Sequence, residues 1–169
     1  YIQDYITKTN NECCTVIQTK DNEICYSEEY KDNAISICFY DLIQRKIKSK
    51  INNINSNGKI FKGFIMISKE LLLIPGKNKI SIININEYNI NKIIFVPNWG
   101  KIIGVCMLNE NLLLTGDSNG IIKQWKIEGD NLILISQKEN SHNDEIFTLI
   151  NIGDGHIASG SKNKLIKIW

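Results

Sequence analysis

Short apolar runs alternate with polar turns along the whole 169-residue chain. Within many runs, apolar and polar residues alternate with the two-residue period of a β-strand, and no stretch repeats with the period of a helix. The stretch GHIASGSKNKLIKIW, residues 155–169, shows the pattern plainly: strands expected at 157–161 and 165–169 are joined by a polar turn at 162–164. Only two prolines interrupt the chain. The pattern therefore predicts a nearly all-β protein.

The same pattern recurs at a regular spacing. NLLLTGDSNGIIKQW (111–125) aligns with GHIASGSKNKLIKIW without a gap, so that Trp125 matches Trp169. ELLLIPGKNKISII (70–83) and NEICYSEEYKDNAISICFY (22–40) repeat the pattern with turns of other lengths, which gives four copies at a period of about 43 residues. One apolar strand precedes each copy, and another follows each of the first three copies, at 45–51, 90–96 and 132–136. Each complete unit is therefore predicted to hold four short strands.

These units resemble the repeats of the WD-repeat β-propeller family. The shared features are a period of about 43 residues, a small residue and a glycine in the second strand, a polar turn, and a tryptophan that ends the third strand. The last unit resembles the family most, because His142 opens it and Trp169 ends its third strand. The resemblance covers essentially the whole chain, although no unit has the Trp-Asp pair that gives the family its name.

The resemblance implies an all-β propeller with about four four-stranded blades in this chain, at residues 9–51, 58–96, 98–136 and 142–169. Residues 1–7 align with the fourth strand of a preceding or closing blade. Propellers of this family typically have about seven blades, so we expect the chain to be a fragment of a larger propeller. A closed ring of four blades is the alternative.

In this family a histidine, a serine or threonine, an aspartate and the tryptophan of a blade form a buried, hydrogen-bonded tetrad. The implied members in the last unit are His142, Ser159, Asn163 and Trp169. Asparagine replaces the usual aspartate there, which removes the charge-assisted part of the hydrogen bond. Three of the positions recur in the third unit, at Thr115, Asn119 and Trp125. Because the first two units lack the histidine and the tryptophan, we expect apolar stacking between sheets to stabilise the fold more than the tetrads do.

Composition and charge exclude several classes of partner. The 20 Lys and Arg residues nearly balance the 18 Asp and Glu residues, so the net charge of +2 favours neither a nucleic acid nor a membrane surface as partner. Every apolar run is too short for a membrane-spanning helix. The five cysteines show no regular disulfide framework, and the chain begins without a signal-peptide pattern. We therefore expect an intracellular protein, in the cytoplasm.

The sequence offers no support for catalysis. The two histidines have no neighbours at metal-ligand spacing, and the chain lacks a phosphate-binding loop, a nucleophile elbow and a zinc-protease motif. We interpret His142 as structural, His156 as a surface or strand-end residue, and Cys25, Cys38 and Cys106 as core thiols. The expectation is a protein without enzyme activity, cofactor or metal.

Binding is the remaining route to function. In the resembling fold, the turns between second and third strands share one end with the loops that enter each first strand. The candidate partner contacts at that end are Glu28, Glu29, Lys77, Lys79, Asp117, Lys162 and Lys164. Their mixed charge favours a protein or peptide over nucleic acid, although the lysines also fit a plain solvated face. Trp99 is the candidate anchor, because large aromatic residues dominate many interfaces, and packing under its loop is the alternative.

These observations predict a non-catalytic scaffold for protein–protein interaction. The first alternative is a substrate-recognition arm of a multidomain enzyme or regulatory protein, such as one linked to a ubiquitin ligase or a kinase. The second is a small-ligand-binding or hydrolytic propeller, which would need carboxylates or histidines facing the central channel.

Overall fold

The structure is a computed structural model that describes residues 12–29, 35–52, 54, 63–95 and 100–169. These residues form strands and turns, and they include no helix. Each sheet is antiparallel and pairs strands that follow one another in the chain.

The first sheet contains β1 (Glu12–Lys20), β2 (Glu23–Glu29), β3 (Ile35–Asp41) and β4 (Lys46–Ile51). The second contains β5 (Ile65–Met66), β6 (Leu71–Pro75), β7 (Lys79–Asn84) and β8 (Asn89–Phe95). The third contains β9 (Ile102–Asn109), β10 (Leu112–Asp117), β11 (Ile122–Glu128) and β12 (Asn131–Lys138), and the fourth contains β13 (Ile146–Gly153), β14 (His156–Ser161) and β15 (Ile166–Ile168).

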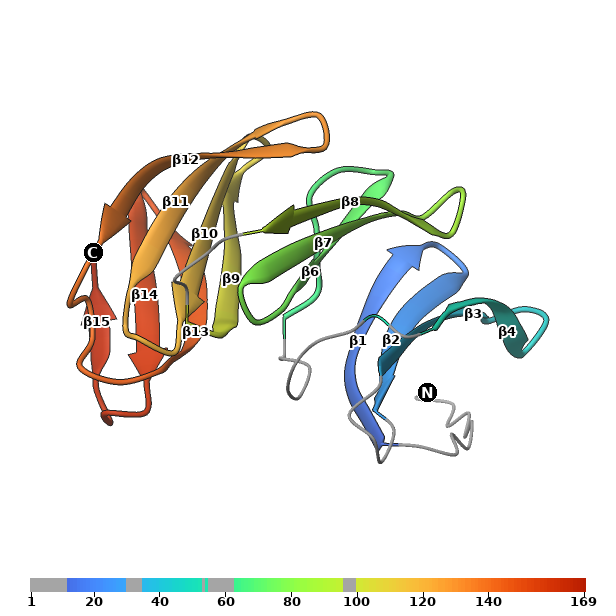
Figure 1. Ribbon diagram of the computed structural model, residues 1–169, viewed down its shortest axis with the longest axis horizontal. Coiled ribbons are helices and arrows are strands. Elements are labelled where there is room, and N and C mark those ends of the chain that lie inside the picture. The colour runs from blue at the N-terminus through green and yellow to red at the C-terminus, as the bar shows by residue number, and fades with distance from the viewer. Residues whose placement is uncertain (1–11, 30–34, 53, 55–62, 96–99) are drawn as a thin grey trace.

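The sheets follow one another in an arc, with the first and last sheets at opposite ends of it (Figure 1). The first strand of the third sheet, β9, lies beside the first strand of the fourth sheet, β13. This succession of three four-stranded sheets and one three-stranded sheet is the arrangement of blades in a β-propeller, so the predicted all-β propeller is confirmed. The described sheets form an open arc rather than a closed ring of four. The strand expected at residues 1–7 lies outside the described residues.

Apolar side chains hold each sheet to the next. Because successive residues of a strand point to opposite faces, Leu72 lies in the cluster between the first and second sheets, and Leu73 lies in the cluster between the second and third. The third cluster joins the third sheet to the fourth through Cys106, Leu114, Ile122, Ile146, Leu149 and Ile157. Burial of these aliphatic groups is the main favourable contribution to the fold.

The outer face of the fourth sheet is uncovered. Ile150, Ile166 and Ile168 are 56%, 79% and 59% exposed. In the aligned positions of the third sheet, Cys106 and Ile122 are buried against the fourth sheet. The repeat therefore places apolar residues on the same face of both sheets, and only the face of the third sheet has a neighbour among the described residues.

Candidate functional site

Four side chains of the fourth sheet form a hydrogen-bonded chain. Trp169 Nε1 donates to Ser159 Oγ over 2.8 Å. Ser159 Oγ lies 2.7 Å from His142 Nε2, and His142 Nδ1 lies 3.3 Å from Asn163 Oδ1. His142 and Ser159 are both 1% exposed. These are the four residues that the sequence suggested as a tetrad, and the structure brings them together.

The directions of these bonds follow from one backbone group. The N–H of Leu165 donates to Asn163 Oδ1 over 3.1 Å, which identifies that atom as the amide oxygen. An oxygen only accepts, so His142 Nδ1 must carry the hydrogen of the neutral ring. Nε2 is then the acceptor, the Ser159 hydroxyl donates to it, and the same hydroxyl accepts from Trp169. The three side-chain hydrogen bonds therefore run in one direction, from the Trp169 indole through Ser159 and His142 to the amide oxygen of Asn163.

Burial lowers the pKa of His142 below its ordinary value. The bond to Asn163 works in the opposite direction, and the nearby Lys167 adds to the lowering. Protonation of Nε2 would also remove the acceptor of the Ser159 hydroxyl. The neutral imidazole thus fits its surroundings, and the arrangement holds the loop of His142 against β14 and β15.

The third sheet holds only part of this arrangement. Trp125 Nε1 donates to Thr115 Oγ1 over 3.0 Å, with both side chains buried. The prediction for Asn119 is wrong, because its side chain is exposed. Asp117 organises the turn instead: its Oδ1 accepts from the N–H groups of Asn119 and Ile121, at 2.9 and 3.0 Å.

In the second, third and fourth sheets the turns between the second and third strands lie at one end of the sheets, which we call the turn end. The turn of the third sheet contacts the loop that precedes β13, where His142 N donates to Gly120 O over 3.1 Å. Gly120 has a φ of 75°, and a Cβ there would overlap the carbonyl oxygen of His142, so only glycine fits. Ser118 N also donates to Lys101 O over 2.8 Å. Main-chain hydrogen bonds therefore hold this turn against the loops that precede β9 and β13.

The predicted partner contacts differ in exposure. Those that are exposed at the turn end are Lys77, Lys162 and Lys164. Those that are half-buried are Glu29 and Lys79. Lys162 lies 3.7 Å from the Glu145 carboxylate and 3.9 Å from that of Asp144. Trp99 lies outside the described residues, and its role stays a prediction.

Two of the predicted contacts are wrong because their carboxylates are buried. Glu28 is 4% exposed, and Lys50 Nζ lies 2.7 Å from its Oε2. Asp117 is 3% exposed and bonds the backbone of its own turn. Neither side chain can reach a partner, since the strand positions that they occupy face the interior rather than the end of the sheet.

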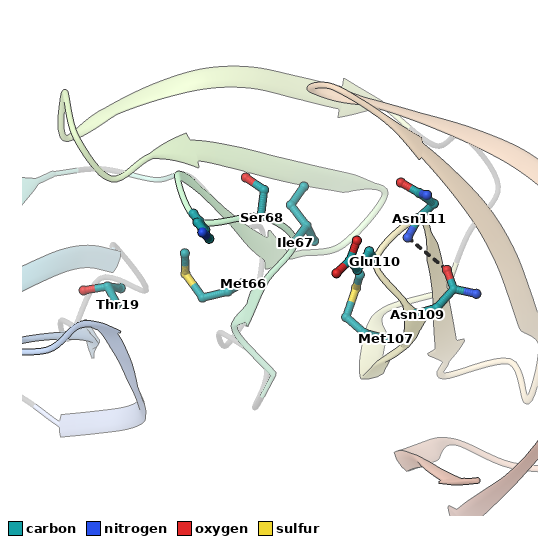
Figure 2. A pocket seen from close by; sticks show the side chains of 9 residues that line it. Thr19, Met66, Ile67, Ser68, Met107, Asn109, Glu110 and Asn111 are labelled. Carbon is teal, nitrogen blue, oxygen red and sulfur yellow. Dashed lines mark hydrogen bonds between the residues drawn. The ribbon is translucent and has the colours of Figure 1, made fainter. Parts of the chain in front are cut away.

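A pocket of about 760 Å³ lies at the opposite end of the sheets, which we call the pocket end. Its lining comes from the first strands of three sheets and the turns that follow β5 and β9. Figure 2 shows Thr19 of β1, Met66 of β5 and Met107 of β9 around the same hollow. This pocket could not be predicted from the sequence, because Thr19, Met66 and Met107 fit the alternation of apolar and polar residues of ordinary strands.

The polar groups of the pocket are held in different ways. Thr19 Oγ1 donates to Glu23 Oε1 over 2.9 Å. Asn109 Oδ1 accepts from Asn111 N over 2.9 Å, a bond drawn in Figure 2. Lys69, after β5, and Glu110, after β9, are exposed and make no hydrogen bond or ion pair within the described part of the chain. The mouth of the pocket thus carries one cation and one anion that have no internal partner.

Other candidate chemistry is limited in the described regions. They contain no group of three or more His, Cys, Asp or Glu residues suited to a metal ion. His156 is exposed at the start of β14, and Cys25, Cys38 and Cys106 are buried free thiols. Burial raises the pKa of these three thiols, which keeps them protonated and poorly nucleophilic at neutral pH. The described residues also provide no helix with the length and apolar character needed to cross a membrane.

Comparison with known proteins agrees with the propeller fold. No protein-family model matches the sequence, and no curated protein matches it either. A chain of the crystal structure of a mitotic checkpoint complex is similar in structure, with a TM-score of 0.74 and 12% sequence identity. The similarity covers 96% of this chain and 50% of that chain, so this chain spans about half the length of the solved one. At this identity the similarity shows the fold alone.

Proposed function

We propose that this chain is an intracellular, non-catalytic scaffold for protein–protein interaction, built on blades of the WD-repeat kind. The observation that carries the proposal is the construction of the turn end. Main-chain hydrogen bonds join Gly120 to His142 and Ser118 to Lys101, so the polar side chains at this end extend from a rigid backbone. Rigidly presented loops on a stable sheet are a common basis for recognition, because little entropy is lost when a partner binds.

Two further observations support a protein partner. The exposed lysines at the turn end are interspersed with carboxylates, as Lys162 is with Asp144 and Glu145. Such mixed charge is suited to another protein surface more than to a phosphate backbone. The similar solved chain is part of a complex, which is the kind of assembly that we propose for this chain.

The proposal is tested by site-specific cross-linking. A photo-reactive amino acid is placed at Lys77 or Lys164 of the turn end and, as a control, at Lys46, which is exposed on the outer strand β4. In extracts of the source cells, we expect both turn-end positions to cross-link to the same protein, identified by mass spectrometry, and Lys46 not to do so. Failure at both turn-end positions, or the same product at Lys46, would contradict the proposal.

A further inference from the structure

The pocket end has a composition that differs from the rest of the surface. The chain contains two methionines, and both line the pocket, Met66 from β5 and Met107 from β9. Both side chains are half-buried, with one part packed on the cores between sheets and the other part toward the hollow. Methionine is unbranched and polarisable, and it adapts to apolar groups of different shapes. Ile67 completes the apolar part of the lining.

The charges at the mouth of the pocket are not used within the protein. Lys69 and Glu110 come from neighbouring turns, line the pocket, are exposed to solvent and have no ion-pair partner in the described part of the chain. A ligand that crosses the pocket would meet an apolar floor with a cation beside one turn and an anion beside the next.

Amides also border the pocket. Asn109 uses its Oδ1 for the backbone of the turn, which leaves its Nδ2 group available as a donor. The exposed side chain of Asn111 offers a donor and an acceptor beside it. These groups match the alternating N–H and C=O groups of an extended peptide.

We propose that the pocket binds an extended peptide segment of a partner protein. One apolar side chain of the segment, such as leucine or methionine, occupies the hollow between Met66 and Met107. A basic residue on one side of it faces Glu110, and an acidic residue on the other side faces Lys69. The asparagine side chains bond the peptide backbone between them.

The charges distinguish this ligand from the other candidates. A phosphorylated ligand or an anionic membrane would be attracted by Lys69 but repelled by Glu110. A purely apolar ligand would leave both charges without a partner. A peptide with one charge of each sign provides a partner for both Lys69 and Glu110. The order of its two charges also determines the direction in which the segment binds. The pocket lies at the end opposite to the turns proposed above as a contact surface, so either proposal can fail without the other.

The test uses fluorescein-labelled peptides in which a leucine is flanked by lysine on one side and glutamate on the other, at separations of one to three residues. Fluorescence anisotropy with the full chain should show saturable binding of at least one spacing. Replacing the peptide leucine by serine should weaken it at least tenfold. Lys69→Glu and Glu110→Lys should each weaken it by a similar factor, whereas Lys46→Glu on β4 should leave it unchanged.

The double variant Lys69→Glu with Glu110→Lys provides the sharpest readout. It should lose the original peptide and bind the peptide with lysine and glutamate exchanged, which a merely structural effect would not produce. Circular dichroism confirms that each variant is folded. The proposal is overturned if no peptide of any spacing binds, or if the charge variants bind the peptide as tightly as the wild type does. It is also overturned if free methionine displaces the peptide at equal concentration, because that result would show that the pocket binds a small zwitterion.

Discussion

The Tyr88 hydroxyl donates a hydrogen bond of 2.6 Å to the carboxylate of Glu23. Tyr88 precedes β8 of the second sheet, and Glu23 begins β2 of the first, so the bond joins two sheets across 65 positions of sequence. Glu23 is 4% exposed, and its other oxygen accepts from Thr19 at the pocket. Lys48 Nζ lies 3.4 Å from the oxygen that Tyr88 contacts. A buried carboxylate thus connects the first two sheets beside the pocket.

We expect Tyr88→Phe to lower the free energy of unfolding by about 1–3 kcal/mol, because the buried carboxylate of Glu23 loses a donor. Urea unfolding measures the change. The Glu23→Gln variant and the double variant complete a mutant cycle that isolates the coupling between the two side chains. Effects that simply add in the double variant would show that the hydroxyl and the carboxylate act independently.

The turn of the third sheet should be intolerant of any side chain at Gly120. In Gly120→Ala the new Cβ would meet the carbonyl of His142 in addition to the cost of a positive φ. Gly155, with a φ of 77° and nothing within 4 Å of the Cβ position, provides a matched control. We expect about 1–2 kcal/mol of destabilisation for Gly155→Ala, from backbone strain alone, and more for Gly120→Ala. Equal losses in thermal or urea unfolding would contradict the close approach of the two loops.

The pKa of His142 predicts how stability depends on pH. The folded state binds this proton more weakly than the unfolded chain, whose histidine has an ordinary pKa of about 6.5. As the pH falls, the unfolded state therefore binds this proton before the folded state does, and the free energy of unfolding should decrease as the pH falls below about 7. His142→Gln should flatten this dependence in urea unfolding, whereas His156→Gln, at an exposed position, should retain it. The same slope in both variants would assign the effect to another group.

The uncovered face of the fourth sheet should promote self-association. Ile166 and Ile168 lie on β15, the last strand of their sheet, where the adjacent edge has no paired strand in the described part of the chain. Exposed aliphatic residues on an unpaired edge favour aggregation, and an added charge opposes it. We expect Ile166→Lys to reduce light scattering on concentration while circular dichroism is retained. Lys46→Gln on β4 is the surface control, and unchanged scattering in Ile166→Lys would contradict the expectation.

The sheets and their order could be predicted because strand period and repeat spacing are local properties of the sequence. The Trp125–Thr115 bond followed from aligning the third unit with the fourth. The role of Asp117 could not be predicted from this alignment, because the side chains of both Asp117 and Asn119 can accept a hydrogen bond from the backbone of the turn. In the structure the acceptor is Asp117 Oδ1, which bonds the N–H groups of Asn119 and Ile121.

The pocket and the buried carboxylates could not be predicted for a different reason. Met66 and Met107 have the same alternation as fully packed strand residues, and the hollow that they border is formed together with residues of other strands and turns. Glu23 and Glu28 look like exposed strand ends, yet partners elsewhere in the chain, Tyr88 and Lys50, make their burial tolerable. Such pairings depend on tertiary contacts that no single repeat contains.

His142 begins the last repeat in sequence but bonds two sheets at once. Its N–H is held by Gly120 of the third sheet, and its ring is held by Ser159 and Asn163 of the fourth. A repeat that ends before His142 would leave the Gly120 carbonyl without its His142 donor, and a repeat that begins after His142 would leave the Ser159 hydroxyl without its acceptor, His142 Nε2. Neighbouring repeats therefore share a residue, and we expect the third and fourth sheets to melt as one cooperative unit.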